Sequence, residues 1–219
     1  MDLPIEMRDL ITPYNLAANE AANMVVTSNS KASFVRRGGF YFTLDMGIRP
    51  YNLRVASQVE RYWEIVGFLN KYPSFSVPVH NMQPSKMKDG NGNFLSLTVQ
   101  GGPYVPGYVS GILVTDRGAN MLNPGQYVKF GSNNKLYQVQ YHNTSTDRIY
   151  LTQPLSHTVT SGNAVVHDEY STESGHPMEN IRHNGIWVEF LNEDFGNPIN
   201  RIEDGILGNI GPLKLRERL

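Results

Sequence analysis

Residues 120–166 read NMLNPGQYVKFGSNNKLYQVQYHNTSTDRIYLTQPLSHTVTSGNAVV, and they decide the fold of the middle of the chain. Polar and apolar residues alternate in short runs such as Gln126–Phe130 and Leu136–Tyr141, and clusters of Gly, Asn, Ser and Thr separate these runs. Alternation with a period of two is typical of strands that have one buried face, and the clusters are typical of tight turns. The stretch therefore predicts an antiparallel meander or a small barrel.

The same pattern extends toward the N-terminus. Phe94–Val99 and Val109–Thr115 are predicted strands, with turn residues between them. Together with the strands of residues 120–166 they give five or six short strands in roughly 75 residues, the size of a small barrel. We expect residues 85–167 to form a small OB-like β-barrel domain that is inserted into a second domain.

The flanking residues, 1–84 and 168–219, are predicted to form this second domain, a discontinuous body. Its clearest strand is Gly39–Gly47, in which apolar and polar residues alternate between two faces. One face is apolar and is expected to be buried, and the other, with Tyr41, Thr43 and Asp45, is expected to stay wet. Further body strands are predicted over Phe75–Val79, Ile186–Leu191 and Leu213–Arg216.

A single helix is predicted over Asn52–Lys71. Asn52 is the expected N-cap, and Pro73 ends the helix. Apolar residues recur at spacings of three and four and form one stripe, namely Val55, Val59, Tyr62, Trp63, Val66 and Leu69. We therefore expect this helix to pack on one face of the body sheet.

Two segments of the body carry weaker patterns. Residues 1–33 are expected to form an extended arm, either loosely docked or ordered against a neighbouring subunit, with at most a short helix over Leu16–Met24. Asn192–Ile210 is rich in Gly and Asn and is predicted to be a loop. The expected fold class is mainly β (α+β), with a β-sandwich or barrel body, one helix and the inserted OB-like barrel.

Composition excludes several classes of function. Lys and Arg number 19 and Asp and Glu 20, so the net charge of −1 does not draw the chain to nucleic acid or to anionic lipid. The absence of cysteine excludes disulfides and thiolate chemistry. The first residues lack the pattern of a signal peptide, and no apolar run approaches the ~18 residues of a membrane span. We expect no membrane partner and no specific nucleic-acid partner.

Catalytic and metal-binding motifs are not found in the sequence. The six histidines show neither an HExxH motif nor a close spacing to carboxylates. Nucleophile elbows, phosphate-binding loops and dinucleotide fingerprints are also missing. We therefore predict that the chain is not an enzyme, has no catalytic residues and needs neither a metal nor another cofactor.

Tyrosines are the candidate ligand-binding residues of the insert: Tyr127, Tyr137, Tyr141 and Tyr150. Exposed tyrosine rings on a small barrel can stack on sugars or bases. The competing interpretation is that they are strand residues that pack across the barrel. Base stacking normally accompanies a basic groove, and the insert has few positive charges.

The C-terminal strand supplies candidate subunit-interface residues, namely Lys214, Arg216 and Arg218. Lys214 and Arg216 alternate with apolar residues, so one face of this strand is basic. We expect the arginines to lie at a sheet edge, where acidic residues of a neighbouring subunit can meet them. Asp194, Glu203 and Asp204 are the candidate partners, and the alternative is a solvated tail.

This order of features resembles the distal tail protein of long-tailed bacteriophages that infect Gram-negative bacteria. The similarity is best in Pro124–Phe130, Lys135–Val139 and Leu151–Leu155, and the ending Leu215–Leu219 is also similar to that of the family. Gln126 stands where the family often has an aspartate. The similarity extends loosely over Ser33–Leu219.

The resemblance implies a structural virion protein, made in the host cytoplasm and located at the tail tip. The body would form a homohexameric ring that joins the tail tube protein to the baseplate hub protein. The insert would project outward, toward side tail fibres or host-surface carbohydrate. The alternative function is a carbohydrate- or oligonucleotide-binding module built on the insert.

Overall fold

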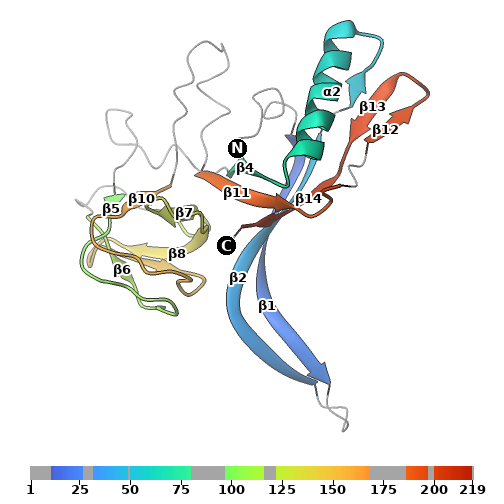
Figure 1. Ribbon diagram of the computed structural model, residues 1–219. Coiled ribbons are helices and arrows are strands. Elements are labelled where there is room, and N and C mark those ends of the chain that lie inside the picture. Colours follow the sequence, from blue (N-terminus) through green and yellow to red (C-terminus); the bar gives the residue numbers. More distant parts are fainter. Residues whose placement is uncertain are drawn as a thin grey trace, which may run out of the picture. The chain divides into compact units, whose positions relative to one another are not determined.

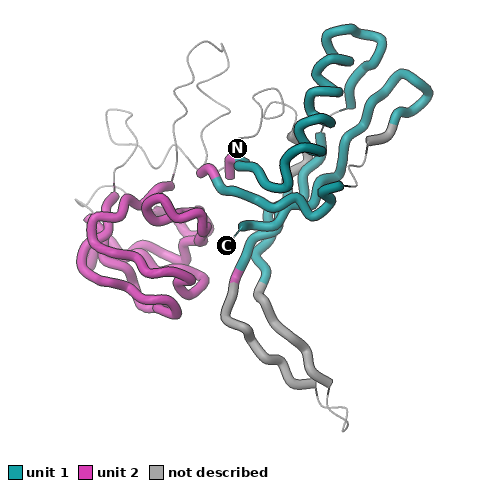
Figure 2. Tube along the Cα trace, viewed as in Figure 1, with its two compact units in different colours: residues 1–19, 41–77, 188–219 teal, residues 20–40, 78–187 magenta. Residues whose placement is uncertain are grey.

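The computed structural model describes residues 11–26, 32–48, 50–79, 97–115, 122–167, 186–196 and 200–218. The chain divides into two compact units (Figure 2). Residues 1–19, 41–77 and 188–219 make up the first unit, and residues 20–40 and 78–187 the second. The expected boundaries of the insert, after residues 84 and 167, adjoin or lie within segments outside the described residues, so they stay predictions.

The fold is mainly β, as the sequence predicts. The largest sheet has five strands in the order β1-β2-β14-β11-β4 (Figure 1). These strands are β1 (Ile11–Val26), β2 (Ala32–Ile48), β14 (Leu213–Glu217), β11 (Ile186–Asn192) and β4 (Ser74–Val79). The predicted strands of the body are therefore confirmed, and β4, which contains Pro78, lies at an edge, where a missing N–H is tolerated.

The N-terminal segment is extended over Ile11–Val26, as the expected arm requires, but these residues form a strand of the main sheet. A short helix over Leu16–Met24 is wrong, because these residues belong to the long strand β1 beside β2. The Asn19 amide donates a hydrogen bond of 2.7 Å to the Thr43 hydroxyl on β2. Pairing with a long neighbouring strand overrides the local helix preference of an Ala- and Asn-rich segment.

Residues 200–210 form a hairpin, so the predicted loop over Asn192–Ile210 is only partly right. β12 (Asn200–Glu203) pairs with β13 (Leu207–Ile210), which also pairs with β3 (Tyr51–Asn52). The Ile206 N–H donates to the Glu203 carbonyl across the turn, and Asp204 and Gly205 both adopt positive φ. An Asp-Gly pair favours such a turn.

The predicted helix is confirmed as α2 (Ala56–Lys71), but it begins later than expected. Val55 is its N-cap, and no side chain caps it. The expected N-cap, Asn52, lies in β3, where its N–H donates to the Gln58 side chain. The helix therefore starts only where the chain leaves the small sheet.

Four helix residues are buried, namely Tyr62, Ile65, Val66 and Leu69. Trp63 was expected in this stripe, but it is 52% exposed. One residue along a helix turns the side chain by about 100°, so Trp63 cannot share the face of Tyr62. The Tyr62 ring instead packs edge-on against Trp63 and against Tyr51 of β3.

The second unit contains a six-stranded sheet with the order β5-β10-β7-β8-β9-β6 (Figure 1). Its strands are β5 (Leu97–Thr98), β6 (Ile112–Leu113), β7 (Tyr127–Phe130), β8 (Tyr137–Asn143), β9 (Arg148–Leu151) and β10 (Ala164–Val166). All pairs given by the register are antiparallel. The predicted antiparallel meander is thus confirmed in β7, β8 and β9.

The expected barrel is not closed. The edge strands β5 and β6 meet at one isolated bridge, Val99 with Val114, instead of a continuous ladder. Backbone hydrogen bonds from Gln100 to Leu113 and from Thr115 to Thr98 flank this bridge. Strands of two residues are too short to extend the ladder further, so the sheet curls without closing as a barrel.

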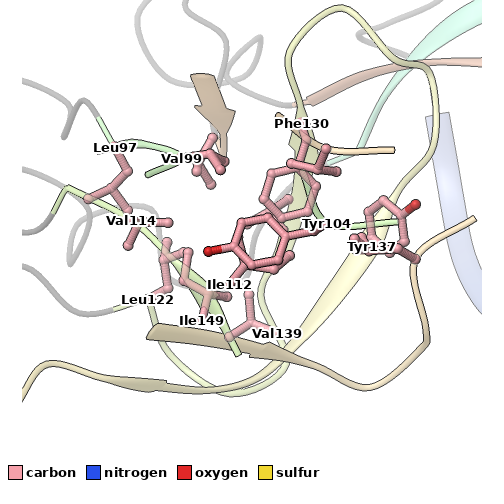
Figure 3. Close-up of a cluster of buried hydrophobic side chains, with 14 residues drawn as sticks. Leu97, Val99, Tyr104, Ile112, Val114, Leu122, Phe130, Tyr137, Val139 and Ile149 are labelled. Carbon is pink, nitrogen blue, oxygen red and sulfur yellow. The ribbon is translucent and has the colours of Figure 1, made fainter. Parts of the chain in front are cut away.

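A single apolar cluster fills the curled sheet (Figure 3). The rings of Tyr104, Phe130 and Tyr137 lie among aliphatic side chains that come from strands and from the loops between them. Every buried member lies between Leu97 and Val165, and these two residues are themselves register partners. The second unit therefore has its own core.

Close packing at Gly208 gives a test of the interface between the helix and the small sheet. A Cβ atom at Gly208 would lie 2.7 Å from the Tyr62 ring, whereas a Cβ at Gly67 in α2 would meet nothing within 4 Å. We predict that Gly208→Ala lowers the free energy of unfolding by about 1–3 kcal/mol. The control Gly67→Ala should raise it by about 0.5–1 kcal/mol, because alanine favours the helix.

Urea unfolding of both variants, followed by circular dichroism, measures these changes. If Gly208→Ala is as stable as the wild type, the Tyr62 ring is not packed against this strand as described.

Candidate binding surfaces

The candidate tyrosines of the insert separate into two groups. Tyr137 is fully buried, and its hydroxyl hydrogen-bonds with Ser156 and with His157 Nδ1. Tyr127 is half-buried on β7, and burial raises the pKa of its phenol. Tyr137 could meet a ligand only if the core opened, so the competing interpretation, strand packing, accounts for it.

Tyr141 and Tyr150 are brought together at the surface. They are register partners on β8 and β9, next to a bulge in β8. Their rings stack with centroids 4.2 Å apart and an interplanar angle of 9°, and Tyr141 is 42% exposed. Partial burial, together with a hydrogen bond and repulsion from Tyr150, raises the pKa of the Tyr141 phenol. The pair therefore offers a neutral, flat aromatic surface.

Gly111 packs closely against the Tyr150 ring of this stacked pair. A Cβ atom at Gly111 would lie 2.7 Å from Cζ of Tyr150 and 2.9 Å from the Arg148 side chain. The Arg148 guanidinium donates a hydrogen bond of 2.6 Å to the Gly111 carbonyl. Only a residue without a side chain allows the Tyr150 ring to approach this backbone so closely. The sequence alone does not reveal this support, because Gly111 is more than 35 residues away.

The second candidate surface is the polar face of the five-stranded sheet. Leu213, Leu215 and Glu217 of β14 are buried, and Lys214, Arg216 and Arg218 are exposed, which confirms the predicted alternation. On β2, Asp45 is exposed and pairs with Lys214, while Thr43 pairs with Arg216. The face is therefore polar and carries charges of both signs.

The expected edge position of the C-terminal residues is wrong. β14 is the central strand of the sheet, between β2 and β11. A short alternating sequence is expected both for an edge strand and for a central strand that has one solvated face, so the sequence does not distinguish these two positions. Removing residues 215–219 would therefore disrupt the middle of the sheet and not only a subunit contact.

Both arginines already have acidic partners in their own chain. Arg218 Nη1 lies 2.6 Å from Glu189 Oε1, and Arg216 Nε lies 3.5 Å from Glu193 Oε1. Ser74 on β4 donates a further hydrogen bond to Glu189. Sequence reasoning missed both glutamates, because cross-strand register, and not sequence spacing, brings them to the arginines. The role of the arginines between subunits stays a prediction.

The acidic residues that were expected to meet the arginines of a neighbouring subunit have the following places in their own chain. Asp194 accepts a hydrogen bond from the Lys214 N–H. Glu203 ends β12, and Asp204 lies in the hairpin turn with a φ of 52°. Their role between subunits stays a prediction.

Neither a protein-family model nor a curated protein matches this sequence. Among the described residues, no group of three or more His, Asp or Glu side chains is arranged to hold a metal ion. Within the same ranges, no helix has the length and apolar character of a membrane span. The candidate surfaces therefore rest on their geometry alone.

The Glu189 contacts predict a pH-dependent contribution to stability. The hydrogen bond from Ser74 and the charge of Arg218 lower the pKa of Glu189, against the opposing effect of burial. A lowered pKa stabilises the fold above the ordinary carboxyl value near pH ~4.3, and the contribution is lost as pH falls through the lowered value. We predict that Glu189→Gln lowers the melting temperature at pH 7 by up to about 4 °C, since such a pair contributes about 0–1 kcal/mol.

Differential scanning calorimetry between pH 3 and pH 7 measures this effect. The matched control is Glu193→Gln, whose ion pair is longer and more exposed and should have a smaller effect. A difference between Glu189→Gln and the wild type that is equal at pH 3 and pH 7 would contradict the assignment.

Proposed function

We propose that the chain is a structural subunit of a ring at the tip of a bacteriophage tail, made in the host cytoplasm. In this proposal the five-stranded sheet with its β1–β2 ribbon builds the ring between the tail tube protein and the baseplate hub protein, and the six-stranded sheet with its loops is an outward module. The basis is the resemblance to distal tail proteins together with one structural observation, the length of the β1–β2 ribbon.

The β1–β2 ribbon is much longer than the sheet to which it belongs. β1 has 16 residues and β2 has 17, whereas β14 has five and β4 has six. At about 3.3 Å per residue, the two long strands span roughly 55 Å. β14 pairs with β2 only over Thr43–Met46. Most of the ribbon therefore has no third strand beside it in the sheets that the described residues form.

Such a ribbon favours assembly. A two-stranded ribbon is at best marginally stable in water, and its unpaired edges are templates for another chain. In a closed ring each copy can cover the ribbon of its neighbour, and every ribbon then has a partner. A freely soluble single-chain binding module would gain nothing from this feature, so the ribbon supports the structural role over the alternative.

The polar sheet face agrees with the same proposal. A tube wall must be apolar where it packs in its subunit and wet where it faces the channel. Phe42, Leu44 and Met46 are buried, while Asp45 is exposed and Tyr41 is half-buried. This distribution meets the condition for a channel-facing sheet, and the charges of both signs avoid a strong field toward one sign of cargo.

The ribbon can be tested in the purified full-length chain. We predict that the wild type forms a particle with six times the 24.6 kDa mass of one chain. Val35→Pro removes a backbone donor from β2 outside the Thr43–Met46 ladder, and it should raise the concentration needed for assembly at least ~10-fold, or by ~1.4 kcal/mol. Val35→Ala keeps the donor and is the matched control.

Multi-angle light scattering across a concentration series measures both quantities. If Val35→Pro assembles at the same concentration as Val35→Ala, the ribbon is not part of the contact. If the wild type remains a single chain at every concentration, the ring proposal is wrong.

A second candidate function rests on the Tyr141–Tyr150 pair, which could hold a saccharide. A flat exposed aromatic ring can stack on the apolar face of a sugar. For comparison, one base that stacks on an aromatic side chain contributes about 1–3 kcal/mol to binding. The neighbouring guanidinium of Arg148 keeps its charge, but it is held to the Gly111 carbonyl, and one fixed cation is not the basic groove that a phosphate backbone needs. Among the two ligands considered, a neutral saccharide therefore suits the surface better than an oligonucleotide.

A glycan array of bacterial surface polysaccharides, read beside a single-stranded oligothymidine, tests this function. We predict that Tyr141→Ala reduces the polysaccharide signal at least ~10-fold, whereas Gln140→Ala, at the neighbouring exposed position, does not. Equal signals for Tyr141→Ala and the wild type, or stronger binding of the oligothymidine, would count against a saccharide site.

A further inference from the structure

Two loops of the second unit contain no charged residue. Residues 100–111 read QGGPYVPGYVSG, and residues 152–163 read TQPLSHTVTSGN. They lack Asp, Glu, Lys and Arg, although charged residues make up 18% of the chain. The one histidine in these loops, His157, has a pKa lowered by burial and by the charge of Lys135, which favours its neutral form. We call these residues the uncharged loop pair.

Backbone hydrogen bonds join the two loops. Tyr104 and Val159 exchange a pair of bonds of 2.8 and 2.9 Å. Gly107 donates to the Leu155 carbonyl, and Leu155 donates to the Tyr108 carbonyl. The two segments therefore form one ordered surface, because each is fixed to the other along its length.

Side-chain contacts anchor the first loop to the core. Tyr104 is buried in the apolar cluster of the second unit (Figure 3). Its hydroxyl donates to the Gln100 carbonyl and accepts from the Leu113 N–H. The Tyr108 ring packs on Tyr104 at 4.9 Å. A loop held in this way loses little conformational entropy when it binds a partner.

The anchored loop exposes two apolar side chains. Val105 is 54% exposed and Val109 is 69% exposed, and Pro103 and Pro106 beside them are exposed as well. Depletion of charge around exposed apolar residues is what distinguishes the centre of a protein interface from the ordinary surface. The uncharged loop pair has this composition.

The charge balance restricts the partner. A charged partner surface would lose its hydration against this loop pair and find no opposite charge in return. Two valines are also a weak membrane anchor, because each fully buried Val side chain contributes only about 1.5–3 kcal/mol and the loop has no cation for lipid phosphates. The matching surface is therefore an uncharged, apolar protein surface.

The described part of the chain offers one such surface, the loop pair itself. Its other exposed large aliphatic and aromatic residues have charged neighbours: Val55 follows Arg54, Trp63 precedes Glu64, Phe195 follows Asp194, Ile202 precedes Glu203, and Leu207 pairs with Glu203. Tyr141 is the exception, and its exposed ring belongs to the candidate saccharide site.

We propose that the uncharged loop pair is a self-association surface, through which two copies of this chain pair about a two-fold axis with Val105 and Val109 at the centre. In a two-fold contact the same patch meets itself, so an uncharged patch automatically meets an uncharged patch. The net charge of −1 adds little repulsion between copies. The contact is small, and small interfaces are weak and reversible.

This contact goes beyond the proposed ring and is separate from it. A ring needs a head-to-tail contact, whereas a two-fold contact doubles whatever unit already exists. Single chains would become dimers, and rings would become pairs of rings. The two contacts can therefore be measured independently in the same protein.

Sedimentation velocity of the full-length chain, from micromolar to several hundred micromolar, tests the proposal. The wild type should double its mass reversibly as concentration rises. Val105→Asp with Val109→Asp should weaken this doubling at least ~10-fold, because four carboxylates would meet at the contact. The control, Gln140→Glu with Thr144→Glu, adds the same charge at exposed positions outside the loop pair and should double like the wild type.

Val105→Ser with Val109→Ser removes the apolar groups without adding charge and should also weaken the doubling. Equal melting temperatures of all variants show that these exposed positions do not affect folding. The proposal is overturned if the aspartate variant doubles like the wild type or if the wild type never doubles. It is likewise overturned if the valine substitutions weaken only the binding of the same variants to phosphatidylcholine vesicles and leave the doubling of mass unchanged. If the wild type forms no six-chain particle, that result contradicts the proposed ring and not the self-association surface.

Discussion

The position of β14 between β2 and β11 is the constraint on which the first unit depends. This C-terminal strand pairs with a strand from residues 32–48 on one side and with a strand from residues 186–192 on the other. Where its ladder with β2 ends, the buried Glu217 carboxylate accepts a hydrogen bond of 3.0 Å from the Phe42 N–H. A buried N–H needs an acceptor, so the glutamate side chain takes over the role of the next backbone carbonyl. β2 can then continue as a ribbon without leaving this donor unpaired.

What this arrangement leaves uncovered supports the proposed function. Helix α2 contacts the small sheet and, through the rings of Phe68 and Phe75, strand β4, whereas the long ribbon exceeds the sheet that its own chain provides. A neighbouring copy is the simplest source of the missing cover. The second unit has a separate core between Leu97 and Val165, so its surfaces can specialise without loss of stability in the first. Its stacked tyrosines and its uncharged loop pair are two such surfaces with different chemistry.

Local patterns predicted the elements, and tertiary pairing decided the rest. The alternation in Gln126–Phe130 and Leu136–Tyr141 and the apolar spacing of α2 were enough to find these elements from the sequence. The strand over Leu16–Met24 was missed because its partner, β2, and not its composition, holds it extended. The ion pair of Arg218 with Glu189 depends on cross-strand register, and the support of Tyr150 by Gly111 depends on a distant loop. Such contacts are set by the folded chain, so no spacing rule reveals them.

The central claim is that this chain builds a closed ring through surfaces that its own sheet leaves uncovered. Negative-stain electron microscopy of the purified full-length protein tests it most directly, because class averages show particle symmetry without any knowledge of a ligand. The account predicts hollow particles with six-fold symmetry, each with six outward modules. Particles with the dimensions of a single chain at all concentrations, or open filaments without closure, would contradict it.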